Sequence, residues 1–122
     1  MYFIKTPRIM ASKRQEQVAQ MIKRNFSIVL SNEGLYIYGE ALVSVTDVKM
    51  SPDLRLAKIY VSIFNTEDKD IVYDLLVQHT PTLKYELVKR IRKHVRRIPD
   101  IQIYRDDLID EMYNIDDMLN NL

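Results

Sequence analysis

Lysine and arginine are the residues whose number and spacing in this chain suggest a chemical task. The formal net charge is only +1, from 18 Lys and Arg against 17 Asp and Glu, but the charges are segregated. Residues 1–24 hold six bases and one acid, and residues 82–99 hold seven bases and one acid. If the two segments meet in space, they predict a polyanionic partner. The first candidates for phosphate contacts are Arg92, Lys93, Arg96 and Arg97, and the second are Lys13, Arg14, Lys23 and Arg24. Lys89 and Arg90 are further candidates on the second basic segment.

Residues suited to catalysis or metal binding form no recognisable motif. The chain of 122 residues has no cysteine, which excludes disulfides, thiolate zinc sites and cysteine nucleophiles. His79 and His94 lack metal-ligand spacing, and the acid pairs after residue 105 lack the glycine and register of a calcium loop. We therefore expect a protein without enzyme activity, metal or cofactor, and one that acts on no small-molecule substrate.

The elements that position the basic residues read as one α+β domain. A helix is expected from the N-cap Ser12 to about Leu30, followed by a loop bracketed by Gly34 and Gly39. Strands at 41–50 and 57–64 are expected to pair antiparallel across a Ser-Pro-Asp turn. A short helix from 71 to about 79, a basic helix from 82 to 98 and a strand at 101–104 follow. The order is α-β-β-α-α-β, that of a type II KH-like domain with a three-stranded sheet packed against three helices.

The expected helix at 82–98 has the clearest periodicity. Apolar residues fall within one sector of the helix, and the bases fall on the opposite side. Pro99 is expected to end this helix. The apolar positions are Leu83, Leu87, Val88, Ile91, Val95 and Ile98.

Residues 43–62, VSVTDVKMSPDLRLAKIYVS, closely resemble the most recognisable segment of the ribosome-binding factor A family. The family pattern reads roughly V-T-D-V-x-x-S-P-D-L-x-x-A-x-V-Y-V-S, and Ile59 stands where the pattern has Val. The basic helices before and after this segment also match the family. The resemblance covers about residues 13–104.

This resemblance implies a function. Ribosome-binding factor A-like proteins are small bacterial assembly factors that bind the small ribosomal subunit and assist late 16S rRNA maturation, often during growth in the cold. The resemblance therefore implies an RNA-binding cytoplasmic protein with the small subunit and 16S rRNA as partners. Two alternatives stay open: a KH-like module for another single-stranded RNA, and a basic interaction domain for an acidic protein.

The turn between the second and third helices departs from the family. Where KH domains have a GxxG loop and this family an Ala-x-Gly kink, the chain has His79, Thr80 and Pro81. Glycine permits close approach of backbone to phosphate, whereas proline fixes φ and removes an amide donor. The helix break is expected to persist by other means. The family's glycine beyond the third strand is also absent around Glu111.

The Ser51-Pro52-Asp53 turn has two interpretations. Ser51 and Asp53 are expected mainly to hold the turn through backbone hydrogen bonds, while Arg55 is as well suited to RNA as to structure. Tyrosines, eight in all, can stack on bases, although Tyr60 is expected to pack within the sheet. The expected domain is 9–105, with peripheral tails at 1–8 and 106–122. No long heptad or membrane segment is apparent, which favours a monomer away from membranes.

Overall fold

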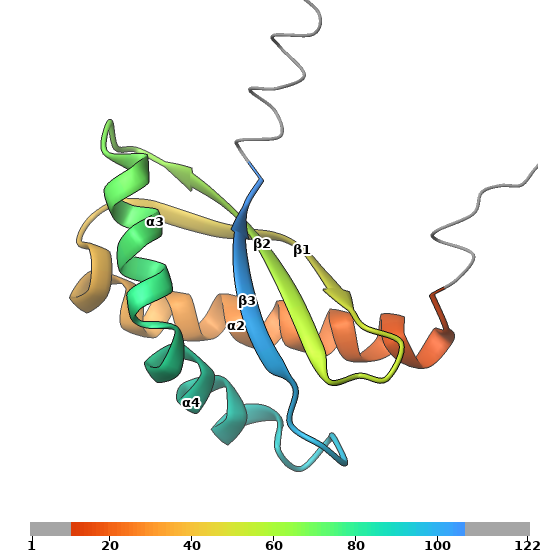
Figure 1. Cartoon of the computed structure of the whole chain (residues 1–122). Helices are drawn as coiled ribbons and strands as arrows, with labels where there is room; N and C mark the ends of the chain where they lie inside the picture. Colours follow the sequence, from red (N-terminus) through yellow and green to blue (C-terminus); the bar gives the residue numbers. More distant parts are fainter. Residues whose placement is uncertain (1–10, 107–122) are drawn as a thin grey trace, which may run out of the picture.

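A computed structural model describes residues 11–106 of the chain as a three-stranded sheet packed against three helices (Figure 1). The elements are α2 (Lys13–Tyr38), β1 (Leu42–Met50), β2 (Leu56–Phe64), α3 (Lys69–Gln78), α4 (Thr80–Ile91) and β3 (Asp100–Arg105). Their order is α-β-β-α-α-β, as predicted. Apart from Asp106, the tails expected at 1–8 and 106–122 lie outside the described residues.

The sheet has the strand order β1-β2-β3. β1 pairs antiparallel with β2, as predicted, and a bulge shifts the register between Val45 and Asp47. β3 pairs parallel with β2 and begins where the Asp100 amide donates to the Arg55 carbonyl over 2.8 Å. Parallel pairing requires a long crossover, which α3 and α4 provide.

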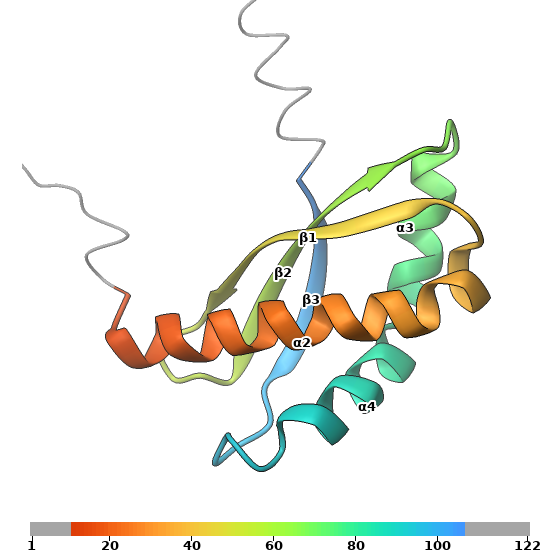
Figure 2. The ribbon, with the colours of Figure 1, turned by 180° about the vertical axis from the view of Figure 1, so that it is seen from behind.

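Alternation along the strands gives the sheet one buried and one open face. Ala57, Ile59, Val61 and Ile63 of β2 are fully buried and face the helices. The neighbours between them, including Lys58 and Tyr60, point the other way. The core therefore lies between one face of the sheet and the helices, and the view from behind shows α2 lying across the sheet in front of β2 and β3 (Figure 2).

The N-terminus of α2 is capped as the sequence predicts. Ser12 Oγ accepts from the Gln15 amide over 3.0 Å, and the Ser12 amide donates to Gln15 Oε1 over 2.7 Å. Gln15 is buried, and its Nε2 also donates to the Met50 carbonyl over 3.1 Å. This reciprocal cap satisfies two amides and ties the helix start to the end of β1.

The prediction of a loop between Gly34 and Gly39 is wrong, because α2 continues to Tyr38. Gly34 is buried inside the helix, and a Cβ at this position would overlap the Tyr38 hydroxyl group. The missing side chain thus makes room for Tyr38, and this packing outweighs the low helix propensity of glycine. Gly39, with φ of 79°, ends the helix in a conformation that L side chains rarely adopt.

None of the helices in the described part of the chain has the length and apolarity to cross a lipid bilayer.

Candidate nucleic-acid interface

Three segments from different parts of the chain meet at one end of the molecule. They are the first turn of α2, the turn between β1 and β2, and the loop between α4 and β3, and they lie side by side in both ribbon views (Figures 1 and 2). A groove joins them, and we call its arginine-bearing surface the basic end. The groove is lined by Arg14, Val18, Asp53, Leu54, Val95, Arg96, Arg97 and Pro99.

The bases after Ile91 do not lie on a helix, contrary to the prediction. α4 ends at Ile91, and the His94 amide donates to the Ile91 carbonyl over 2.8 Å in the turn that follows. Val95 packs on the core and Pro99 is fully buried, so the loop must stay close to the sheet. A helix continued to 98 would carry the chain away from the point where Asp100 joins Arg55. Packing and strand pairing therefore override the helical periodicity.

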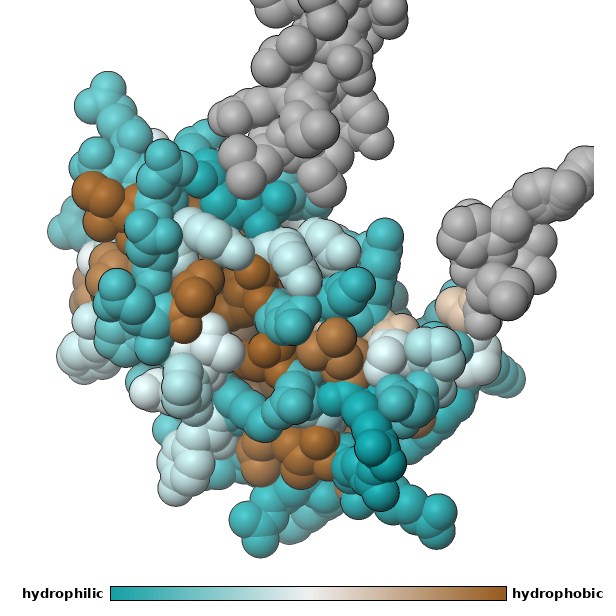
Figure 3. Space-filling model, in the orientation of Figure 1, coloured by the Kyte–Doolittle hydropathy of each residue, from teal (hydrophilic) through white to brown (hydrophobic). Residues whose placement is uncertain are grey.

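This shorter helix changes the surroundings of the predicted RNA contacts. Arg92, Lys93, Arg96 and Arg97 are all exposed, Arg92 at the end of α4 and the others in the loop. Arg96 and Arg97 join Arg14 in the groove, so the structure brings bases from both basic segments together. Lys13 adjoins Arg14 in the first turn of α2. The hydropathy view shows deep teal, hydrophilic side chains over this end (Figure 3).

Positive charge at the basic end is largely uncompensated. Among residues 11–106, the four salt bridges join Arg55 to Asp53, Lys84 to Asp100, Lys89 to Glu86 and Arg105 to Asp70. None involves the arginines of the groove, and Asp53 is the one acid that lines it. Adjacent like charges raise the local positive potential, which attracts phosphate and releases counterions when phosphate binds.

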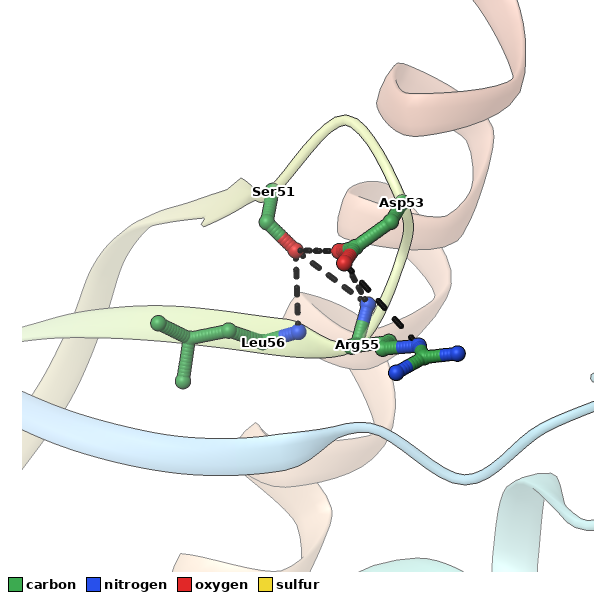
Figure 4. Close-up of polar contacts among 4 residues, drawn as sticks. All are labelled: Ser51, Asp53, Arg55 and Leu56. Carbon is green, nitrogen blue, oxygen red and sulfur yellow. Dashed lines mark hydrogen bonds and ion pairs between the residues drawn. The ribbon is translucent and has the colours of Figure 1, made fainter.

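The turn between β1 and β2 is held by its own side chains (Figure 4). Ser51 Oγ donates to Asp53 Oδ1 over 2.7 Å and accepts from the Leu56 amide over 3.0 Å. Asp53 Oδ1 also accepts from the Arg55 amide over 3.0 Å. These bonds confirm the predicted structural role of Ser51 and Asp53, and they hold Leu54 at a φ of 63°.

The same hydrogen bonds affect the acidity of Asp53. The bond from Ser51, followed by the one from the Arg55 amide, holds the pKa of the Asp53 carboxyl below its ordinary value. Asp53 is therefore charged at neutral pH, and its carboxylate accepts hydrogen bonds from within the turn. Its bonds leave the groove arginines to other anions.

Arg55 lies on a second groove beside the basic end. Its side chain is 63% exposed, and its Nε lies 3.9 Å from Asp53 Oδ2, a loose contact. The second groove also includes Thr80, Pro81 and Lys84. Lys84 Nζ lies 2.5 Å from Asp100 Oδ1, so its charge is compensated. Arg55 is thus the base of this groove that is positioned for an external anion.

The remaining predicted bases lie along α2 and α4, away from the groove at the basic end. Lys89 and Arg90 line a groove between α2 and α4 with Glu33 and Glu86. The hydrogen bond that Lys89 donates to the Glu86 carboxylate raises the pKa of Lys89, and Arg90 Nε donates to Asn25 Oδ1 over 3.1 Å. These two bases are partnered locally. Lys23 is half-buried and Arg24 exposed in the middle of α2, and neither lines any of these grooves.

The break between α3 and α4 is a single residue, His79, which caps both helices. The His79 amide donates to the Leu75 carbonyl over 3.0 Å, and Pro81 occupies the first turn of α4. Proline suits a helix start because the amide it lacks would have no helical partner there. The turn thus forms without glycine, as expected.

The open face of the sheet carries aromatic and basic side chains that were not among the predicted site residues. Tyr60 of β2 stacks on Tyr104 of β3 with ring centroids 5.5 Å apart and planes 26° from parallel. Lys49 Nζ lies 5.4 Å from the Tyr60 ring centroid, and Lys49 pairs with Lys58 in the β1–β2 register. In the sequence, the alternation of Lys58 and Tyr60 with apolar residues is the signal that these two side chains share the solvent-facing side of the sheet. The pairing with Tyr104 depends on the fold.

Within residues 11–106, no group of three or more His, Cys, Asp or Glu side chains is placed to hold a metal ion.

The fold and the charged surface define a type II KH-like α+β domain with one strongly basic end. Comparison with known proteins gives the family. A family model described as Ribosome-binding factor A matches residues 14–119. The Cytophaga hutchinsonii ribosome-binding factor A is 40% identical over 113 residues, covering 93% of this chain and 85% of that protein. The Chlorobium luteolum protein of the same name is 33% identical over 112 residues, covering 91% and 92%. This chain belongs to the ribosome-binding factor A family.

Solved structures agree in fold. The crystal structure of ribosome-binding factor A from Thermus thermophilus superposes with a TM-score of 0.59 at 21% identity, covering 75% of this chain and 94% of that one. A homology model of the Thermus thermophilus factor, fitted into a cryo-EM map of a 30S–RbfA complex, gives a TM-score of 0.55 at 23% identity. It covers 70% of this chain and 88% of that one. At these identities the likeness concerns the fold.

Proposed function

We propose that this protein binds the small ribosomal subunit through 16S rRNA and assists the late maturation of that RNA. Family membership supports the proposal, as does the Thermus thermophilus factor placed in a 30S complex. In this proposal the protein acts as a monomer by binding alone, with no catalytic step and no cofactor.

The observation that carries the proposal is the groove shared by Arg14, Arg96 and Arg97. Arginine grips phosphate with two parallel N–H donors and also stacks on unpaired bases. Three such side chains on one surface suit the closely spaced phosphates of folded RNA. We assign the main rRNA contact to the basic end, including Lys13, Arg92 and Lys93, with Arg55 at its border.

Co-sedimentation tests the proposal. Purified protein is mixed at low salt with purified small subunits, with large subunits or with neither, and each mixture is centrifuged through a sucrose cushion. The proposal predicts that the protein pellets with small subunits and is released by high salt, because phosphate contacts are salt-dependent. Equal pelleting with both subunits, or none with either, would contradict it.

A second experiment addresses maturation. Cells depleted of the protein are expected to accumulate small subunits whose 16S rRNA retains unprocessed ends, as measured by primer extension. If depleted cells contain fully processed 16S rRNA, the role in maturation is refuted, while the proposal that the protein binds the small subunit is unaffected.

A further inference from the structure

The open face of the sheet presents aromatic rings beside basic side chains. Tyr60 and Tyr104 are register partners on β2 and β3, and their rings stack. Lys49 lies against the Tyr60 ring, which orders the three side chains across the strands as Lys49, Tyr60 and Tyr104. Because β3 is an edge strand of the sheet, Tyr104 ends this row, and 37% of the residue is exposed.

Other contacts hold the row in place. The Tyr104 hydroxyl group donates to Gln102 Oε1 over 2.5 Å, so the ring leans along its own strand. A cation near the face of a tyrosine ring is attracted by its electron density, which favours the Lys49 position. The ring that would receive a ligand is therefore oriented before any ligand arrives.

Two lysines on this face favour an anionic ligand. Lys49 and Lys58 stand opposite each other in the β1–β2 pair, and both are exposed. Neither takes part in a salt bridge among residues 11–106. Their charges are therefore free to attract phosphate beside the rings.

The acids near the rings are engaged by the protein itself. Asp47, beside Tyr60 in the register, accepts through Oδ1 from the Val48 amide over 2.9 Å. Asp106, two residues beyond Tyr104, accepts through Oδ2 from Thr46 Oγ1 over 2.5 Å. These hydrogen bonds hold both carboxylates within the domain, and neither carboxylate reaches a lysine of the open face as an ion pair.

The open face also adjoins the basic end. Lys58 lies three residues along β2 from Arg55, which borders the turn that lines the arginine groove. Tyr60 follows two residues later, so roughly 17 Å of strand separates Arg55 from Tyr60 at ~3.3 Å per residue. A polyanion held at the basic end can therefore continue onto this face.

We propose that the open face binds single-stranded RNA. An unpaired base stacks on the outer side of the Tyr104 ring and so extends the row of Lys49, Tyr60 and Tyr104. The adjacent phosphates lie near Lys49 and Lys58. Stacked rings beside cations are the combination that recognises unpaired bases without strong sequence preference. This site rests on the proposed RNA-binding function and adds a separate surface to it. It also explains why two tyrosines stand on the solvent side of the sheet.

The test compares two fluorescein-labelled RNAs by anisotropy: an unstructured mixed-sequence 12-mer and a 12-base-pair duplex. The variants are Tyr104→Ala, which removes the ring, and Tyr104→Phe, which keeps the ring and loses the hydroxyl group. We expect Tyr104→Ala to weaken binding of the single strand about tenfold and to leave duplex binding within twofold. Tyr104→Phe should bind both RNAs like the wild type, because its ring can still stack on Tyr60 without the hydrogen bond to Gln102.

Two controls separate this site from a loss of folding. Thermal melting must give similar curves for the three proteins, and the duplex affinity reports whether the basic end is intact. Ultraviolet crosslinking followed by mass spectrometry should then place the single strand on the peptide that contains Tyr104. A crosslink that avoids this peptide would overturn the assignment.

The outcomes distinguish the two proposals. If the wild type binds neither RNA, the open-face site fails, and co-sedimentation with small subunits decides separately whether the proposed function fails with it. If the wild type binds both RNAs and Tyr104→Ala is unchanged, the open face is not an RNA site, while the basic end remains one. If Tyr104→Ala weakens co-sedimentation with small subunits but not binding of the single strand, the face contacts the subunit in another way and the assignment to single-stranded RNA is wrong.

Discussion

Arg14, in the first turn of α2, lines the same groove as Arg97, in the loop that leads to β3. The two side chains come from distant segments of the sequence. Gln15 ties the start of α2 to the Met50 carbonyl at the end of β1, and the pairing of β1 with β2 and of β2 with β3 links that point to the loop before β3. Asp53 is the acid of this groove, and its carboxylate accepts hydrogen bonds from the Ser51 hydroxyl group and the Arg55 amide. The basic end is therefore a built surface that is ready for an external anion.

Removing one arginine should change the salt dependence of RNA binding. Arg97→Ala is expected to reduce the slope of log K against log salt by about one, because one phosphate contact is lost. Anisotropy titrations at several salt concentrations measure this slope. Lys69→Ala, a base at the start of α3, is the matched control and should leave the slope unchanged. Equal slopes for the two variants would contradict the assignment.

The carboxyl group of Asp53 should titrate with a pKa below 3.8, its ordinary value, because Ser51 and the Arg55 amide stabilise its charged form. A depressed pKa in the folded state adds stability that is present above the unfolded-state pKa and is lost as pH falls through the folded-state pKa. Carbon-detected NMR titration measures the pKa. Ser51→Ala should raise it toward 3.8, and a wild-type value at or above 3.8 would refute the turn geometry.

The cap of α2 should contribute measurably to stability. Ser12→Ala removes the side-chain acceptor for the Gln15 amide and should lower the free energy of unfolding by about 1 kcal/mol. Urea denaturation followed by circular dichroism measures this change. Ser31→Ala, at an exposed position inside the same helix, is the control and should be neutral or slightly stabilising. A Ser12→Ala variant as stable as this control would argue against the cap.

Gly39 should resist substitution for a backbone reason. Its φ of 79° and ψ of −141° lie in a region that is strained for other residues. Gly39→Ala should therefore cost about 1–3 kcal/mol although no side chain blocks the new Cβ. The neighbouring exposed Glu40→Ala should stay within about 0.5 kcal/mol of the wild type. Urea midpoints for the two variants decide the matter, and equal midpoints would exclude strain at Gly39.

Local patterns predicted most of the fold. The Ser12 cap of α2, the antiparallel pairing of β1 with β2 and the element order all follow from periodicity and turn chemistry. The two errors arise where tertiary packing prevails. Tyr38 fills the space left by Gly34, which allows the helix to continue, and burial of Pro99 beside β3 draws the chain after Ile91 away from helical geometry.

The candidate site was predictable as a set of residues but not as a surface. Charge segregation identified Arg96 and Arg97 as candidates. The position of Arg14 beside them depends on contacts between distant segments, which local periodicity does not encode. The stacking of Tyr60 on Tyr104 likewise depends on the parallel register of β2 and β3.

The central claim is that the basic end, and not net charge, binds the small ribosomal subunit. The most direct test measures the affinity of small subunits for two triple variants that lose the same charge. One replaces Arg14, Arg96 and Arg97 with alanine, and the other replaces Lys69, Lys89 and Arg90. We predict that the first variant loses at least about tenfold in affinity while the second stays within about threefold of the wild type. Equal losses in both variants would contradict the claim.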